Sequence, residues 1–276
     1  MISKFFIIIF SIIFLVSCSQ KQNEVSLIKE VDQQAELVTT YSEAMENLKK
    51  GDTFFAANKF LEAELLFPQS DWAPKSALMA AYSYYEINYY EDAVYEIDRF
   101  LLNYPNHSYI PYARFLRAIC YFESVVDEKK DLKPILNAKK EFNYIIENYP
   151  NTDFSLDSKY KLELIENILA AKEMYIGRYY LQRKKWISAI NRFKKVVRDY
   201  ETTIYTPEAL HRLVEIYYNI GLVEESKKYA SVLGYNYLSD TWYKETYKIY
   251  NKDYEDPKLK IKKDKKNLLE KFKSLF

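Results

Sequence analysis

The sequence predicts an all-α protein, a solenoid of about five helix-turn-helix repeats. Two observations lead to this prediction. The chain has only 4 Gly and 8 Pro among its 276 residues, too few turn formers for an all-β protein. Small and large apolar residues also recur at fixed intervals along most of its length, as expected for stacked helical hairpins that share one core.

The clearest repeat signal is a spacing between small side chains on paired helices. Ala81 precedes Ala93 by twelve residues, and Gly177 precedes Ala189 by twelve residues as well. A large residue follows four positions later, such as Phe193. This pattern resembles the tetratricopeptide repeat, which implies a right-handed superhelical stack. Small residues let paired helices approach closely, and the stack leaves a concave groove.

The remaining units follow the pattern less regularly. Ala44 and Phe60 belong to the first unit, and Ala118 with Ala138 to the third, where twenty residues separate the two alanines. The third unit therefore contains about eight extra residues, which we assign to a charged surface loop at 125–134. Downstream, residues 155–185 contain no Pro and predict one long helix.

The amino terminus predicts secretion and lipid attachment. Residues 5–16 are almost continuously apolar, too few for a membrane-spanning helix of about 20 residues but suited to a signal peptide. The sequence Leu15-Val16-Ser17-Cys18 resembles the lipobox of bacterial lipoproteins, which implies cleavage before Cys18 and acylation of that residue. Ser19 follows, where lipoproteins retained at the inner membrane often carry Asp. The resemblance thus favours the periplasmic face of the outer membrane.

Four segments follow from these patterns. They are a lipoprotein signal peptide at 1–17, a lipid-anchored linker at 18–36, a repeat domain at 37–250 and a basic amphipathic tail at 251–276. The tail has eight Lys between residues 258 and 276 against two acidic residues, with apolar residues at helical spacing. Such a segment could lie on anionic lipid, bind a partner groove or remain a solvated tail.

Composition argues against nucleic-acid binding and against catalysis. The 40 basic and 39 acidic residues leave no charge excess to recruit nucleic acid. The chain has only two histidines, His107 and His211, and neither belongs to a metal or triad motif. We therefore predict a binding scaffold that is not an enzyme and needs no cofactor or metal. Scattered carboxylates leave a glycan-active helical enzyme as a distant alternative, and Cys120 is expected to be a core residue.

The order of the motifs carries a closer resemblance. The run Ile97-Asp98-Arg99-Phe100, followed by Tyr104-Pro105-Asn106-His107 and, further on, Arg198-Asp199-Tyr200, resembles the BamD family of outer-membrane assembly factors. The resemblance covers about residues 41–235 and implies a lipoprotein of the complex that inserts β-barrel proteins into the outer membrane. The implied partners are the POTRA domains of BamA, other Bam lipoproteins and unfolded barrel proteins.

Two departures from that family and one competing identification remain. Glu201 stands where other units have Pro, and the tail after Asn251 is longer than the resemblance requires. Another periplasmic repeat lipoprotein, one that organises cell-wall or envelope assembly, would show the same repeats, because a solenoid specifies a shape and not a ligand.

Two candidate binding surfaces follow. The first helices of repeats one to three should line a groove for an extended peptide with an aromatic end, since aromatic side chains give contact area at low entropic cost. The groove residues are Tyr41, Met45, Leu48, Tyr82, Tyr85, Glu86, Tyr112, Phe115, Ile119 and Phe122. The alternative is that many of them belong to the core between repeats. Arg192 and Arg198 match the family's basic positions near BamA, and the alternative for them is a solvated cationic helix face.

Overall fold

The computed structural model describes residues 23–251 except 126, 128, 239 and 240, and side chains from residue 35 onward. Cys18 and the tail at 252–276 lie outside the described residues. Within the described part, all regular structure is helical, in eleven helices, and no strand occurs. The prediction of an all-α fold of tetratricopeptide-type helix pairs is confirmed. Searched over the same residues, no helix is both long and apolar enough to cross a membrane.

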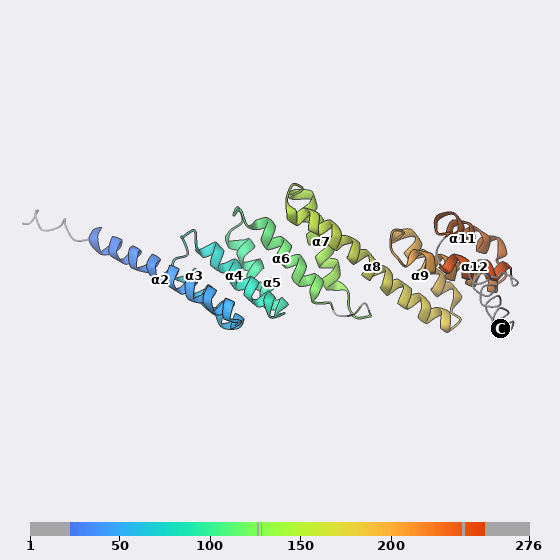
Figure 1. Ribbon diagram of the computed structural model, residues 1–276, viewed down its shortest axis with the longest axis horizontal. Coiled ribbons are helices and arrows are strands. Elements are labelled where there is room, and N and C mark those ends of the chain that lie inside the picture. Colours follow the sequence, from blue (N-terminus) through green and yellow to red (C-terminus); the bar gives the residue numbers. More distant parts are fainter. Residues whose placement is uncertain (1–22, 126, 128, 239–240, 252–276) are drawn as a thin grey trace, which may run out of the picture. The chain divides into compact units, whose positions relative to one another are not determined.

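The chain forms two compact units, the first ending at Ser124 and the second starting at Val125. Unit 1 contains α2 to α6, and each helix packs against the next one in the chain (Figure 1). Their bounds are α2 Asn23–Lys50, α3 Thr53–Leu66, α4 Ala73–Glu86, α5 Tyr90–Asn103 and α6 Ile110–Glu123. Helix α2 begins at Asn23, inside the segment 18–36 that the sequence analysis assigns to a linker. The boundaries of the four segments remain predictions.

Unit 2 contains α7 to α12, with α8 at 30 residues as its longest helix. The bounds are α7 Lys133–Asn148, α8 Asp153–Gln182, α9 Trp186–Asp199, α10 Thr206–Asn219, α11 Val223–Asn236 and α12 Thr241–Tyr250. The prediction of one long helix over 155–185 is confirmed by α8 up to Gln182, and the last three predicted residues form the turn before α9. Helix α12 packs mainly on α10, where His211 Nδ1 lies 2.8 Å from Thr246 Oγ1.

The hairpin turns share one backbone conformation. Gly51, Asn88, Lys184 and Gly221 have φ of 85°, 62°, 55° and 83°, and each lies two residues before the second helix of its pair. Glycine adopts this left-handed conformation without steric cost and Asn tolerates it, whereas Lys184 has a Cβ that opposes it. The same turn geometry therefore sets the register of four helix pairs.

Helix starts and close helix contacts follow from local sequence. Proline occupies the first or second position of α4, α6, α7 and α10, where its missing N–H has no helical partner to lose. Ala44 packs beside Phe60, and Gly177 beside Phe193, each pair sixteen residues apart. Both phenylalanines are fully buried, so the small residue makes room for the large one.

The inserted segment of the third repeat lies on α8. Lys172 Nζ donates to the carbonyl oxygens of Lys129 and Lys130 at 2.7 and 2.9 Å. The ammonium of Lys129 lies 5.6 Å from the centre of the Tyr175 ring. The described residues from Val125 to Leu132 form no helix, as predicted, whereas Lys133 and Pro134, which the prediction included in the loop, already belong to α7. The contacts of Lys129 and Lys130 hold the middle of the segment against the long helix.

Candidate binding surfaces

Four of the predicted groove residues come together between α4 and α6 of unit 1. Tyr82, Tyr85 and Glu86 lie within one turn at the end of α4, and the ring centres of Tyr82 and Tyr85 are 6.2 Å apart. Tyr112, near the start of α6, lies close enough to Tyr82 and Glu86 for their negative charges to raise its pKa. The three tyrosines are half-buried and Glu86 is exposed, so this part of the prediction describes an accessible surface.

Two further residues complete this surface. The ring of Tyr90, the first residue of α5, lies 6.2 Å from that of Tyr85, and its hydroxyl donates to Asn88 Oδ1 at 2.7 Å. Glu123, the last residue of α6, is in polar contact with Tyr85 and Tyr90. We call Tyr82, Tyr85, Tyr90 and Tyr112 the tyrosine cluster.

Burial and neighbouring carboxylates shape the electrostatics of the cluster. A hydrogen bond to Glu86, with burial, raises the pKa of Tyr82. Burial first, and then Glu123, raises the pKa of Tyr85 and of Tyr90. Burial raises the pKa of Tyr112 to about 12. The hydroxyls therefore stay protonated at neutral pH and act as hydrogen-bond donors.

The groove residues on α2 have a different environment. The Tyr41 ring packs edge-on against Phe60 and Trp72, with centres 5.2 and 5.0 Å apart. Met45 and Leu48 pack against the buried cluster around Phe60. All three α2 residues are half-buried, and their packing favours the alternative that they serve mainly as core between helices.

The predicted groove residues on α6 differ in how exposed their side chains are. Ile119 is 7% exposed and belongs to the core of unit 1, while Phe115 and Phe122 are half-buried. Cys120 is fully buried beside Ile119, and burial raises the pKa of its thiol to about 12. A thiol held protonated in this way is a poor nucleophile, in keeping with the expected core role.

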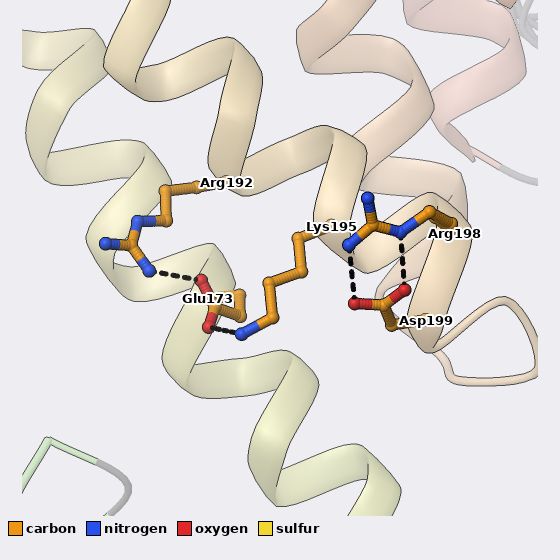
Figure 2. A network of polar contacts seen from close by, with 5 residues as sticks. All are labelled: Glu173, Arg192, Lys195, Arg198 and Asp199. Carbon is orange, nitrogen blue, oxygen red and sulfur yellow. Dashed lines mark hydrogen bonds and ion pairs between the residues drawn. The ribbon is translucent and has the colours of Figure 1, made fainter.

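A cationic surface lies along α8 and α9 of unit 2 (Figure 2). Arg192 and Lys195 both reach Glu173, with nitrogen-to-oxygen distances of 2.9 and 2.6 Å. Burial alone would raise the pKa of Glu173, but the hydrogen bonds from Lys195 and Arg192 outweigh it and lower the pKa. One ionised carboxylate thus faces two cations, leaving a local positive charge.

Arg198 is placed differently from Arg192. Its side chain is 76% exposed and pairs with the adjacent Asp199 at 2.6 and 2.9 Å (Figure 2). An exposed pair between neighbouring residues contributes little free energy, so Arg198 can exchange Asp199 for another carboxylate at small cost. Of the two predicted docking residues, Arg198 is the accessible one and Arg192 is the one held in place.

A shallow cavity of about 310 Å³ opens beside Arg192. Its lining consists of Tyr180, Ser188, Asn191, Arg192 and Lys195. Hydroxyl, amide, guanidinium and ammonium groups can all donate hydrogen bonds. The cavity is therefore suited to an acceptor such as a carboxylate side chain.

The histidines have structural contacts. His107 Nδ1 accepts a hydrogen bond of 3.2 Å from the Tyr109 N–H in the turn before α6. His211 is buried, and burial lowers its pKa, so its ring is neutral where it meets Thr246. Within the described part of the chain, no three His, Cys, Asp or Glu side chains are arranged to hold a metal ion.

The paired helices define an all-α repeat protein of the tetratricopeptide type. Residues 33–233 match the YfiO family, described as an outer membrane lipoprotein. The chain is 40% identical over 234 residues to the outer membrane protein assembly factor BamD of Caulobacter vibrioides, covering 85% of this chain and 76% of that protein. The chain therefore belongs to the YfiO/BamD family of outer-membrane assembly proteins.

Other relatives agree with this assignment. The outer membrane protein assembly factor BamD of Rickettsia prowazekii is 39% identical over 215 residues, covering 78% of this chain and 86% of the relative. The resemblance to the BamD family that the motif order indicates is thus confirmed. Among solved structures, MamA 41-end from Desulfovibrio magneticus RS-1 aligns with a TM-score of 0.35 and 12% identity over 74% of this chain and 97% of that one.

Proposed function

We propose that this chain is a lipid-anchored periplasmic scaffold of the machinery that inserts β-barrel proteins into the outer membrane. It binds the POTRA region of BamA, other Bam lipoproteins and unfolded barrel substrates, and it catalyses no reaction. The observation that carries the proposal is the similarity, over most of the chain, to relatives named as assembly factors. Acylation of Cys18 would hold the protein at the membrane.

Substrate binding is assigned to unit 1. The tyrosine cluster presents half-buried rings beside an exposed carboxylate, so a peptide can gain aromatic contacts without displacing core residues. Tyrosine loses little side-chain entropy on binding and offers both a ring and a hydroxyl, which suits peptides of varied sequence. Of the ten predicted groove residues, Tyr82, Tyr85, Glu86 and Tyr112 are the ones we assign to peptide contact.

Replacing Tyr82 and Tyr85 together with Ala should weaken binding of a Phe-ending peptide at least tenfold from a starting affinity of roughly micromolar, because buried aromatic anchors contribute most of an interface's free energy. The measurement is fluorescence anisotropy of a labelled peptide with the full chain in detergent. Thermal melting would establish that the variant folds.

Tyr160→Ala with Tyr235→Ala is the matched control, because both tyrosines are exposed and lie in unit 2. This double variant should bind the peptide like the unaltered chain. An unchanged affinity in the Tyr82 and Tyr85 variant would remove the tyrosine cluster from the substrate site.

Docking to BamA is assigned to the surface formed by α8 and α9. Arg192 is held by Glu173, and the cavity beside it offers several hydrogen-bond donors. Arg198, six residues further along α9, can change partner at small cost. A guanidinium can hold a carboxylate through two parallel hydrogen bonds, so this surface favours an acidic patch on the partner.

Purification of the tagged chain from detergent-solubilised outer membranes should recover BamA in the eluate, and the Arg198→Glu variant should recover several-fold less. Reversing the charge turns an attraction toward the acidic partner into a repulsion, which accelerates dissociation and slows association. The measurement is quantitative immunoblotting of BamA against the bait.

Lys50→Glu serves as the control, since Lys50 is an exposed residue of α2 whose ion partner Glu46 is equally exposed. It should recover BamA at the unaltered yield. Absence of BamA from every eluate would overturn the proposed function, whereas full recovery with Arg198→Glu would overturn only the docking assignment.

A further inference from the structure

Two carboxylates lie at the tyrosine cluster, those of Glu86 and Glu123. Glu86 lies beside Tyr82 and Tyr112, and Glu123 lies beside Tyr85 and Tyr90. Among the described residues, no Lys, Arg or His forms an ion pair with either carboxylate. The surface is therefore anionic as well as aromatic.

Other carboxylates at helix contacts are neutralised within the protein. Glu64 receives two hydrogen bonds from Arg99 at 2.8 and 2.5 Å, and Glu173 is bound by Arg192 and Lys195. The tyrosine hydroxyls beside these carboxylates differ in the same way. The positive charge of Arg99 lowers the pKa of Tyr104 and so opposes the rise caused by burial and Glu64. Among the described residues, no cation lowers the pKa of any of the four tyrosines in the cluster.

We propose that unit 1 selects peptides that carry an arginine or lysine, whose cationic group packs on the rings of the tyrosine cluster between Glu86 and Glu123. The inference rests on the proposed peptide-binding function of this surface and names the side-chain chemistry it prefers. Charge complementarity is the argument: aromatic faces attract cations through their negative ring quadrupole, and a carboxylate at each side supplies the counter-charge.

Arginine fits this surface better than lysine. Its planar guanidinium can stack on one ring while its edge donates to a carboxylate, and it is less strongly hydrated than an ammonium. The rings of Tyr85 and Tyr90 have centres 6.2 Å apart and planes inclined by 49°, and both lie beside Glu123. A planar guanidinium can stack on one of these rings and still donate a hydrogen bond to the carboxylate.

The test compares short synthetic peptides that all end in Phe and differ only in a single Arg, Gln or Glu, which is placed in turn at each internal position. With the full chain, the best Arg position should bind about five- to tenfold more tightly than Gln at the same position, and Glu should bind more weakly than Gln. In the variant carrying Glu86→Gln and Glu123→Gln, the advantage of Arg should fall to less than about twofold.

The Gln-substituted peptide provides an internal check on folding, because it should bind this variant as well as it binds the unaltered chain. Glu147→Gln with Glu163→Gln, two exposed carboxylates of unit 2, is the matched control and should keep the Arg preference. Equal binding of Arg and Gln peptides, or an Arg advantage that survives in the Glu86 and Glu123 variant, would overturn this inference alone. Failure of every peptide to bind would overturn the peptide groove and the inference together.

Discussion

Replacing Arg99 with Met should lower the free energy of unfolding by about 3–5 kcal/mol, because it leaves two buried carboxylates without a counter-charge. Arg99, on α5, donates to Glu64 of α3 at 2.8 and 2.5 Å and to Glu96 of its own helix at 2.8 Å. Glu64 is 4% exposed and Glu96 is 7% exposed, and the Tyr104 hydroxyl also donates to Glu64 at 3.0 Å. Urea-induced unfolding followed by circular dichroism would measure the loss.

Two comparisons separate the buried network from a general effect of losing an arginine. Arg198→Met removes an exposed guanidinium paired only with its neighbour and should leave stability nearly unchanged. Adding Glu64→Gln and Glu96→Gln to Arg99→Met should recover much of the lost stability, since neutral amides cost less to bury than unpaired carboxylates. A small loss in Arg99→Met alone, matching that of Arg198→Met, would contradict this account of the network.

The fold was predictable because packing in this protein repeats along the chain. The spacing from Ala81 to Ala93 recurs from Gly177 to Ala189, and the helix pairs lie where these residues place them. Proline near the start of α4, α6, α7 and α10 adds a local signal for where helices begin. The division of the chain into two compact units after Ser124 could not be predicted. Residue spacing indicates which adjacent helices pack together, but it does not indicate how the helices group into larger units.

The candidate site was predictable only in part. Positions on one helix can be grouped by their spacing, so Tyr82, Tyr85 and Glu86 were correctly placed on one face of α4. Tyr90 follows a turn with Asn88 in the left-handed region, and the direction of its ring depends on that turn. Glu123 lies four residues after Ile119 on α6, so helical spacing could have indicated it.

Contacts between residues distant in sequence limit what could be predicted about the charged side chains. The motif containing Arg99 was visible in the sequence, but its partner Glu64 lies 35 residues away on another helix. Likewise, Arg192 and Arg198 belong to one helix, yet only Glu173 of α8 distinguishes the held side chain from the exposed one. Which charge is neutralised depends on helix packing, and the one-dimensional pattern does not contain that information.

Replacing Gly177 with Val should lower the free energy of unfolding by about 3 kcal/mol, through overpacking at the contact of α8 with α9. A Cβ atom at Gly177 would lie 2.6 Å from Cε1 and 2.9 Å from Cζ of the Phe193 ring, well inside van der Waals contact. Phe193 is fully buried within a cluster that includes Met174 and Ala189, so its ring has little room to move. The better helix propensity of Val over Gly offsets only a few tenths of a kcal/mol. Urea-induced unfolding of the full chain would measure the effect.

The origin of this loss can be tested by shrinking the opposing side chain. In a Phe193→Leu background, Gly177→Val should cost at least about 1 kcal/mol less than in the unaltered chain, because the two positions share one space and their effects are coupled. An equal cost in both backgrounds would show that the valine acts through its own helix and not through the ring. The same reasoning applies to Ala44 and Phe60, which have the same separation in sequence, and so connects the repeat spacing directly to how closely paired helices can approach.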